Sequence, residues 1–234
     1  MTEPGAPAGG WREATVRTVD HPTGHGVRLL LDVPDRIAHL PGQHYVIRLT
    51  APDGYTAQRS YSIASAPHEE PLEFYIERLP DGEVSGFLAD VVEPGDTLRI
   101  RGPIGGWFVW RGDVPALAVA GGSGVVPLVS MLRHARATGA TELLKLAAAA
   151  RTVEELPYAN ELISAGALVA LSRADTPTRP GGRLSGAELA GLVRPDQLGY
   201  ICGSTGFAEA TGRLLVDNGL PAERIRVERF GPTG

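Results

Sequence analysis

The first half of the chain alternates apolar and polar positions in short runs that are separated by proline, glycine and aspartate turns. Runs of this kind, rich in β-branched and aromatic residues, are typical of strands. About six strands without a long helical segment predict a small antiparallel barrel or sandwich. The runs are Trp11–Val19, Gly26–Val33, His44–Thr50, Arg59–Ala64, Leu72–Arg78 and Thr97–Arg101, with one short helix expected at Val84–Val92.

The pattern changes after Pro115, where the continuous apolar run Ala116–Ala120 leads into a glycine-rich loop and a helical stretch that ends near Ala137. The order of buried strand, loop and helix then recurs at Leu143–Ala149, Leu168–Ser172 and Gly199–Cys202. Strands that alternate with helices indicate βαβ units and a parallel sheet. The second half is therefore predicted to be an α/β domain.

Length and composition agree with this organisation. A chain of 234 residues with 43% hydrophobic and 21% charged residues is typical of a globular protein with two domains. We expect a Pro-, Gly- and Ala-rich disordered lead-in at 1–10, an antiparallel β-barrel domain at 11–112 and a parallel α/β domain at 113–234.

The composition also argues against several classes of protein. No apolar run approaches the roughly 20 residues that span a bilayer, and the N-terminus lacks the basic start and apolar core of a secretory signal, so we expect a cytoplasmic location. A net charge of −5 argues against nucleic acid as a partner. Cys202 is the single cysteine, so the chain forms no internal disulfide and cannot supply four thiolates to an iron–sulfur cluster.

The glycine-rich loop reads Gly121-Gly122-Ser123-Gly124. Glycines at a strand-to-helix turn let the backbone approach a ligand, and the following helix offers free N–H groups to phosphate. The spacing is neither the G-x-G-x-x-G dinucleotide fingerprint nor a P-loop. Taken alone, the loop is compatible with phosphate binding or with a plain tight connection.

A more specific motif, Arg59-Ser60-Tyr61-Ser62, lies on a predicted strand of the barrel. Other motifs accompany it along the chain: Pro41–His44, Gly82–Leu88, Gly102–Gly105, Gly121–Pro127, Cys202–Phe207 and Glu228–Phe230. In these residues and their order, the chain resembles the ferredoxin–NADP(H) reductase superfamily, whose flavin signature is Arg-x-Tyr-Ser. The resemblance covers nearly the whole chain from about Trp11, and it implies a flavin-binding barrel followed by a nicotinamide-nucleotide domain.

The resemblance implies roles for the residues on the flavin side. Arg59 would pair with the FAD pyrophosphate, for which a guanidinium fork is well suited. Tyr61 would lie against the flavin, and Ser62 would hydrogen-bond near its N5 atom. Plain barrel packing and a surface arginine are the alternatives for these positions. Further cofactor-binding positions implied are Ser60, Gly82, Val84 and Ser85, where the helix N–H groups and the Ser85 hydroxyl would meet the second phosphate.

On the nicotinamide side, the resemblance places the cofactor against Gly122, Ser123, Gly124, Cys202 and Gly203. Cys202 would border the site of hydride transfer without acting as a nucleophile, although a buried structural cysteine is the alternative interpretation.

The last motif of the chain is an acid-x-aromatic pattern formed by Glu228 and Phe230. By resemblance, Phe230 would stack on the flavin and be displaced by nicotinamide. The following residues, 231–234, would then continue over the flavin. The implied catalytic set is Ser62, Cys202, Glu228 and Phe230.

The choice of nicotinamide cofactor depends on Ser172 and Arg173, which follow the third strand of the second domain. A hydroxyl and a guanidinium at this place favour the 2′-phosphate of NADPH, whereas the nearby Asp175 keeps NADH possible. Arginines that would add to this basic pocket are Arg151, Arg179 and Arg183.

The resulting hypothesis is an enzyme that passes hydride from NADPH to bound FAD. It would pass electrons on to a separate acceptor, a ferredoxin or a small molecule, without a fused iron–sulfur domain. An NAD(P)H:flavin reductase that releases reduced flavin is one alternative, and a non-catalytic flavin-binding subunit of an electron-transfer complex is another. No metal site is expected, because His21, His25, His39 and His44 lack the spacing and companions of one.

Overall fold

The computed structural model describes residues 10–230, so the predicted lead-in and the tail at 231–234 lie outside the described residues, except for Gly10. The first half forms an antiparallel six-stranded sheet with the order β4-β3-β6-β1-β2-β5. Its strands are β1 (Trp11–Thr23), β2 (Gly26–Asp32), β3 (His44–Thr50), β4 (Thr56–Ser62), β5 (Leu72–Glu77) and β6 (Thr97–Ile104). Helix α1 (Glu83–Asp90) follows β5 and confirms the predicted short helix.

The sheet closes into a barrel just beyond the end of β4. Ile63 forms an antiparallel bridge with Phe74 of β5, and the Ala64 N–H donates to the Glu73 carbonyl oxygen at 2.8 Å. Ile63 and Phe74 are fully buried in the barrel core. The predicted antiparallel barrel is therefore confirmed, and β5 is the strand that completes it.

The second half is a parallel five-stranded sheet with the order β11-β10-β7-β8-β9. Its strands are β7 (Ala116–Gly121), β8 (Leu144–Ala150), β9 (Leu168–Leu171), β10 (Leu198–Gly203) and β11 (Ile225–Arg229). The helices are α2 (Val125–Thr138), α3 (Ala159–Ser164), α4 (Gly186–Ala190) and α5 (Thr205–Asp217). Apolar residues on the two faces of the sheet form separate cores, one with α2 and α3 and one with α4 and α5. This confirms the predicted α/β domain. Within residues 10–230, no helix is both long and apolar enough to cross a membrane.

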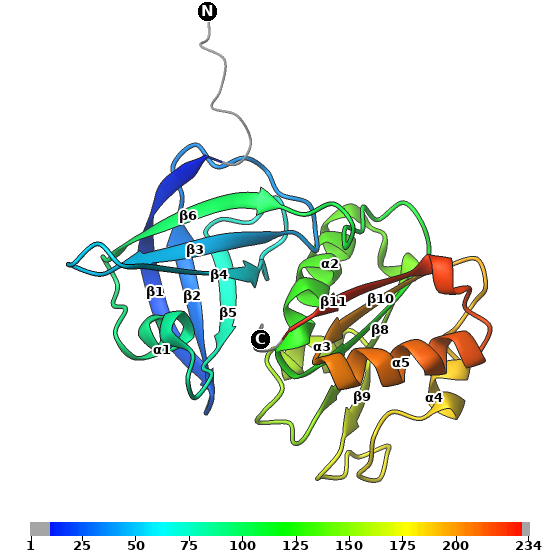
Figure 1. Cartoon of the computed structure of the whole chain (residues 1–234). Coiled ribbons are helices and arrows are strands. Elements are labelled where there is room, and N and C mark those ends of the chain that lie inside the picture. Colours follow the sequence, from blue (N-terminus) through cyan, green and yellow to red (C-terminus); the bar gives the residue numbers. More distant parts are fainter. Residues whose placement is uncertain (1–9, 231–234) are drawn as a thin grey trace, which may run out of the picture.

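Four strands differ from the sequence prediction by more than one residue at an end. β4 begins at Thr56 and ends at Ser62, where Arg59–Ala64 was expected, and β6 continues past Arg101 to Ile104. β1 continues past Val19 to Thr23, because its polar end pairs with the start of β2. β11 was expected only as a terminal motif and not as a strand. It pairs in parallel with β10 from Ile225 onward and forms one edge of the sheet, and its carboxyl end points toward the barrel (Figure 1).

The connection between the two sheets runs from residue 105 to residue 115. Phe108 and Trp110, in this connection, pack in the core that contains α2 and not in the barrel core. We therefore propose a domain boundary near Gly105, earlier than the expected 112/113.

Buried polar groups join the two domains. Arg133 of α2 donates to Glu73 of β5 at 2.6 Å and to Glu161 of α3 at 3.0 Å. The Ser130 hydroxyl of α2 donates to the Ser65 carbonyl oxygen at 2.7 Å, and the buried His39 bonds to the same oxygen at 2.9 Å. The bonds from Arg133 to Glu73 and from Ser130 to Ser65 cross the domain junction and fix α2 against the barrel.

Candidate flavin and nicotinamide site

The glycine loop and the end of β10 approach each other closely at the carboxyl edge of the parallel sheet. Gly122–Gly124 forms one turn of 3₁₀ helix between β7 and α2. A side chain at Gly124 would collide with the Cys202 carbonyl oxygen, and it would lie 2.9 Å from the Gly203 backbone nitrogen. Only glycine permits this contact, so it brings together two segments that the sequence placed at the nicotinamide site.

Ser123 in the same loop contacts the barrel. Its hydroxyl donates to the Glu77 Oε2 atom of β5 at 2.5 Å. The sequence analysis did not identify Glu77, and only the three-dimensional packing reveals it. The hydroxyl that was expected at the nicotinamide is therefore bonded across the domain junction.

Cys202 and Glu228 form an adjacent pair on β10 and β11. The Cys202 side chain is fully buried, and burial, with a further contribution from Glu228, holds the pKa of its thiol well above the usual value. Burial also raises the pKa of Glu228 to about 7. The thiol is therefore neutral, which agrees with a bordering rather than a nucleophilic role.

Two unpartnered polar atoms lie near one small cavity. Ser62 ends β4 opposite His44 of β3, and its hydroxyl is buried with no hydrogen-bond partner in residues 10–230. The Glu228 Oε2 atom is likewise buried and unpartnered among the described residues. His44 and Glu228 line the same cavity, of about 210 Å³. Buried polar atoms normally have partners, so this arrangement fits a polar ligand that completes the site.

The flavin motif presents one free cation and one half-buried ring. Arg59 is exposed on β4, and the only acceptor of its guanidinium among residues 10–230 is the neighbouring Gln58 carbonyl oxygen, at 2.7 Å. Ser60 is exposed beside it. Tyr61 packs at the margin of the barrel core, and burial raises the pKa of its hydroxyl. An uncommitted guanidinium beside an aromatic face suits a phosphate-bearing ring cofactor.

The turn that begins α1 differs from the sequence expectation. The Ser85 hydroxyl accepts from the Leu79 N–H at 3.2 Å and donates to the Gly82 carbonyl oxygen at 3.3 Å. The Val84 side chain is buried in the barrel core. A side chain at Gly82 would collide with the Ser85 hydroxyl. The turn therefore offers backbone N–H groups to a phosphate, whereas the Ser85 hydroxyl is engaged within the turn.

The basic residues expected around the adenosine are only partly free. The Arg173 N–H bonds to the Arg151 carbonyl oxygen at 2.9 Å, so the ends of β8 and β9 lie together. Ser172, Arg173 and Arg183 are exposed, and Arg151 lies 3.7 Å from Glu155. Arg179 forms an ion pair with Glu188 and donates to three loop carbonyls.

Arg179 therefore holds its own loop and is not available to a phosphate. Asp175 is also used locally, because its carboxylate accepts from the Gly181 N–H at 2.7 Å. Arg179 and Asp175 are therefore both engaged within the loop. Neither the additional cation nor the competing carboxylate that the sequence placed near Arg173 is free to face a bound nucleotide.

Phe230 ends the described chain beside Gly203, to whose carbonyl oxygen its N–H donates at 2.9 Å. Its ring is partly buried against the α/β core. The carboxyl edge of the sheet thus gathers Gly124, Cys202, Glu228 and Phe230. The expectation that the tail continues over the flavin falls outside the described residues.

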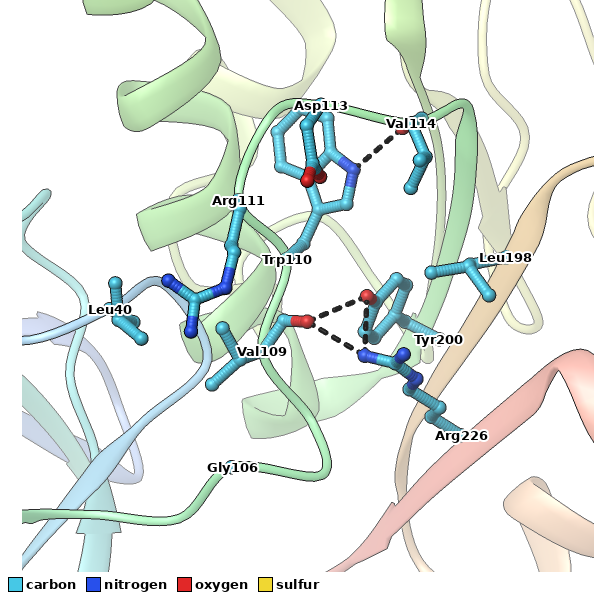
Figure 2. A pocket seen from close by; sticks show the side chains of 10 residues that line it. All are labelled: Leu40, Gly106, Val109, Trp110, Arg111, Asp113, Val114, Leu198, Tyr200 and Arg226. Atoms are coloured by element: carbon cyan, nitrogen blue, oxygen red, sulfur yellow. Dashed lines mark hydrogen bonds between the residues drawn. The ribbon is translucent and has the colours of Figure 1, made fainter.

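A larger cavity, of about 350 Å³, lies elsewhere at the domain junction and contains none of the predicted site residues. There the Val109 carbonyl oxygen accepts from the Tyr200 hydroxyl and from Arg226, both at 2.8 Å (Figure 2). Tyr200 and Arg226 are already bonded to Val109 there, so the size of this cavity alone does not make it the functional site.

Comparisons with known proteins agree with a fold of FAD-binding oxidoreductases. The family model for the oxidoreductase FAD-binding domain matches residues 21–109. The ferredoxin–NAD(P)(+) reductase component of the naphthalene 1,2-dioxygenase/salicylate 5-hydroxylase systems of Ralstonia sp is 30% identical over 95% of this chain and 70% of its own length. The reductase component of propane 2-monooxygenase from Rhodococcus jostii (strain RHA1) is 31% identical over 81% of this chain, which spans 55% of that relative.

Among solved structures, the flavohem-like FAD/NAD binding domain of nitric oxide dioxygenase from Vibrio cholerae O1 biovar El Tor superimposes with a TM-score of 0.84 at 24% identity. The match covers 94% of this chain and 99% of that one, and it shows the shared fold. The similarity to the Ralstonia relative and the match to the FAD-binding family model show that the chain belongs to the ferredoxin–NADP(H) reductase superfamily of FAD-binding oxidoreductases.

Proposed function

We propose that the protein passes hydride from NADPH to bound FAD and electrons from the flavin to a separate acceptor such as a ferredoxin. The observation that carries this proposal is the meeting, at one sheet edge, of Cys202 and Gly203 with the unpartnered carboxyl of Glu228. The unpartnered Ser62 hydroxyl supports it from the barrel side.

Each group has a distinct task in this proposal. FAD, when bound, supplies the hydride acceptance and the one-electron chemistry. Arg59 binds the pyrophosphate, Tyr61 packs against the ring system, and Ser62 offers its hydroxyl near the reacting edge. Glu228, with a pKa of about 7, can take up or release a proton near neutral pH.

NADPH is the proposed donor because Ser172 and Arg173 are exposed together at the end of β9. The loss of Arg179 from the basic pocket weakens this preference without removing it, because Arg173 forms no ion pair with any described residue and so remains free for a 2′-phosphate. An acceptor protein is supported by the names of the relatives, which are reductase components.

A second candidate is an NAD(P)H:flavin reductase that releases its flavin. The engaged hydroxyl of Ser85 favours it, because one contact expected to hold the second phosphate is already used within the turn. Retention of stoichiometric FAD through gel filtration contradicts this alternative.

The deciding experiment is an anaerobic absorbance titration of the purified, FAD-loaded protein with NADPH and, separately, NADH. We expect bleaching of the bound flavin band, with NADPH as the faster donor. If neither donor bleaches the flavin, the proposed reductase activity is wrong. If NADH reacts faster, the assignment of Ser172 and Arg173 to a 2′-phosphate is wrong.

A further inference from the structure

Alternate residues of β5 line the junction with the α/β domain. Side chains at every second position of a strand share one face, so Glu73, Tyr75 and Glu77 point away from the barrel core, in which the intervening residues are buried. Glu73 accepts a hydrogen bond from Arg133, whereas Glu77 accepts one from Ser123 of the glycine loop. This face of β5 therefore ends with a carboxylate at the glycine loop.

Ser123 is the sole hydrogen-bond partner of the Glu77 carboxylate in residues 10–230. Its hydroxyl donates to the Oε2 atom at 2.5 Å, within the range typical of a hydroxyl bonded to an ionised carboxylate. No arginine, lysine or histidine in this part of the chain lies within ion-pair distance of Glu77, although Glu73 on the same face is paired with Arg133. No cation therefore competes with Ser123 for the Glu77 carboxylate.

The bond to Glu77 determines which hydrogen bonds the Ser123 oxygen can still make. A hydroxyl has one proton to donate and two lone pairs that accept, and a free hydroxyl rotates to suit its neighbour. In Ser123 the proton is committed to a charged acceptor, which holds it more strongly than a neutral amide oxygen would. The half-buried Ser123 oxygen is therefore left as a hydrogen-bond acceptor only.

Ser123 lies where the topology of the parallel sheet places a ligand. β8 and β10 lie on opposite sides of β7, so the strand order reverses between β7 and β10. Open α/β sheets bind their ligands outside the carboxyl ends of the strands at such a reversal. Ser123 follows the carboxyl end of β7, and the neighbouring Gly124 packs against the end of β10. A nicotinamide ring bound there would meet an acceptor at Ser123, and its only donor is the carboxamide NH2 group.

We propose that Glu77 is a positioning residue that holds the Ser123 hydroxyl as an acceptor for the carboxamide NH2 of the bound nicotinamide. The identity of the ligand rests on the proposed function. In this arrangement the carboxamide oxygen is turned away from Ser123. Recognition of the NH2 group makes the site selective for a carboxamide over a substituent of the same shape that has no donor.

The test compares NADP⁺ with its 3-acetylpyridine analogue, in which a methyl group replaces the carboxamide NH2. Calorimetry gives the Kd of each nucleotide for the FAD-loaded protein. We expect the analogue to bind the unaltered protein about fivefold more weakly, which corresponds to the loss of one neutral hydrogen bond. In Glu77→Ala the Ser123 proton is free to meet the acetyl oxygen, so the ratio of the two Kd values should fall to within about twofold of one.

Three further variants separate this role from a general loosening of the domain junction. Glu142→Ala removes an exposed carboxylate just before β8, at the amino end of the sheet, and should leave the ratio unchanged. In Ser123→Ala the acceptor is absent, so adding Glu77→Ala should change the ratio no further. Glu77→Gln keeps the size of the side chain with an uncharged acceptor, and its ratio should lie between those of the unaltered protein and Glu77→Ala.

An unchanged ratio in Glu77→Ala would overturn the proposal, as would an analogue that binds the unaltered protein as tightly as NADP⁺ does. The proposed function is tested separately by flavin reduction. If the Kd ratios behave as expected but NADPH does not reduce the flavin, the reductase activity is wrong and the role of Glu77 stands. If NADPH reduces the flavin and the ratio does not respond to Glu77→Ala, the role of Glu77 alone is wrong. If neither nucleotide binds, both are wrong.

Discussion

Cys202 and Glu228 stand side by side on neighbouring parallel strands, so a thiol and a carboxyl share one buried environment. Burial raises the pKa of both groups, and the nearby Glu228 adds to the effect on Cys202. Each therefore favours its neutral form, and of the two only Glu228 titrates near neutral pH.

The first prediction concerns stability and pH. The pKa of Glu228 is raised from an ordinary 4.5 to about 7, so the folded chain binds the proton more tightly than the unfolded chain. The contribution of Glu228 to the free energy of unfolding of the flavin-free protein should then fall as pH rises from about 4.5 to 7, by up to about 3 kcal/mol. His39, whose pKa is lowered to about 4 by burial, contributes in the opposite direction, so the Glu228 contribution is obtained as the difference from Glu228→Gln. Urea unfolding across this window, with Glu228→Gln and the exposed control Glu209→Gln, measures it. If the difference in unfolding free energy between the unaltered protein and Glu228→Gln does not change across this window, the assignment is wrong.

Arg59 should govern retention of FAD. Its guanidinium has no carboxylate partner in the described chain, so Arg59→Ala removes a cofactor contact without breaking an ion pair. We expect the Kd for FAD to rise about tenfold or more, since hydrogen bonds to charged groups contribute about 1.5–3 kcal/mol. The ratio of flavin to protein absorbance after gel filtration measures this, with Arg213→Ala, at an exposed position without an ion pair in the described chain, as control. A variant that stays fully loaded removes Arg59 from the phosphate role.

Arg173 should discriminate between the nicotinamide cofactors. Arg173→Ala is expected to raise the KM for NADPH about tenfold and to change the KM for NADH little, because only NADPH carries the 2′-phosphate. Steady-state reduction of ferricyanide with each donor provides the measurement, and Arg194→Ala is the matched surface control. Equal effects on the two donors would argue for a structural role at the end of β9.

A side chain at Gly124 should destabilise the protein and weaken binding of the nicotinamide cofactor. In Gly124→Ala the added carbon meets the Cys202 carbonyl, so either the loop or β10 must move, at a cost of about 1–3 kcal/mol. We expect a lower Tm and a raised KM for the nicotinamide cofactor, with FAD still bound. Gly206→Ala is the control, because open space surrounds that position in α5. Similar stability of the two variants would show that the close approach is dispensable.

Much of the fold followed from periodicity. Alternating runs predicted the barrel strands, and the continuous apolar runs predicted β7, β8, β9 and β10, because strands buried on both faces have no polar side. β11 was missed because Ile225 and Val227 alternate with charged residues on a half-exposed edge. Barrel closure through Ile63 and Phe74 was also not visible, since it depends on a bridge of one residue pair.

The candidate site was likewise predicted only in part. The motifs identified the segments that meet at the sheet edge, because the carboxyl ends of parallel strands share one edge. Side-chain partners were not predictable. Ser123 bonds to Glu77, which is 46 positions away, and Arg179 pairs with Glu188. Neither contact can be inferred from the spacing of residues along the sequence.

The bond between Glu73 and Arg133 has a consequence for how the molecule unfolds. Glu73 lies on the strand that closes the barrel, and Arg133 lies on the first long helix of the parallel domain. If one domain melted alone, the other would lose this ion pair and the bond from Ser130 to Ser65, and the apolar cluster that joins Ala64 and Tyr75 to Val126 would be exposed to water. Heat should therefore melt the two domains as one cooperative unit, with a single calorimetric peak, and the slowest-exchanging amides should include those of β5.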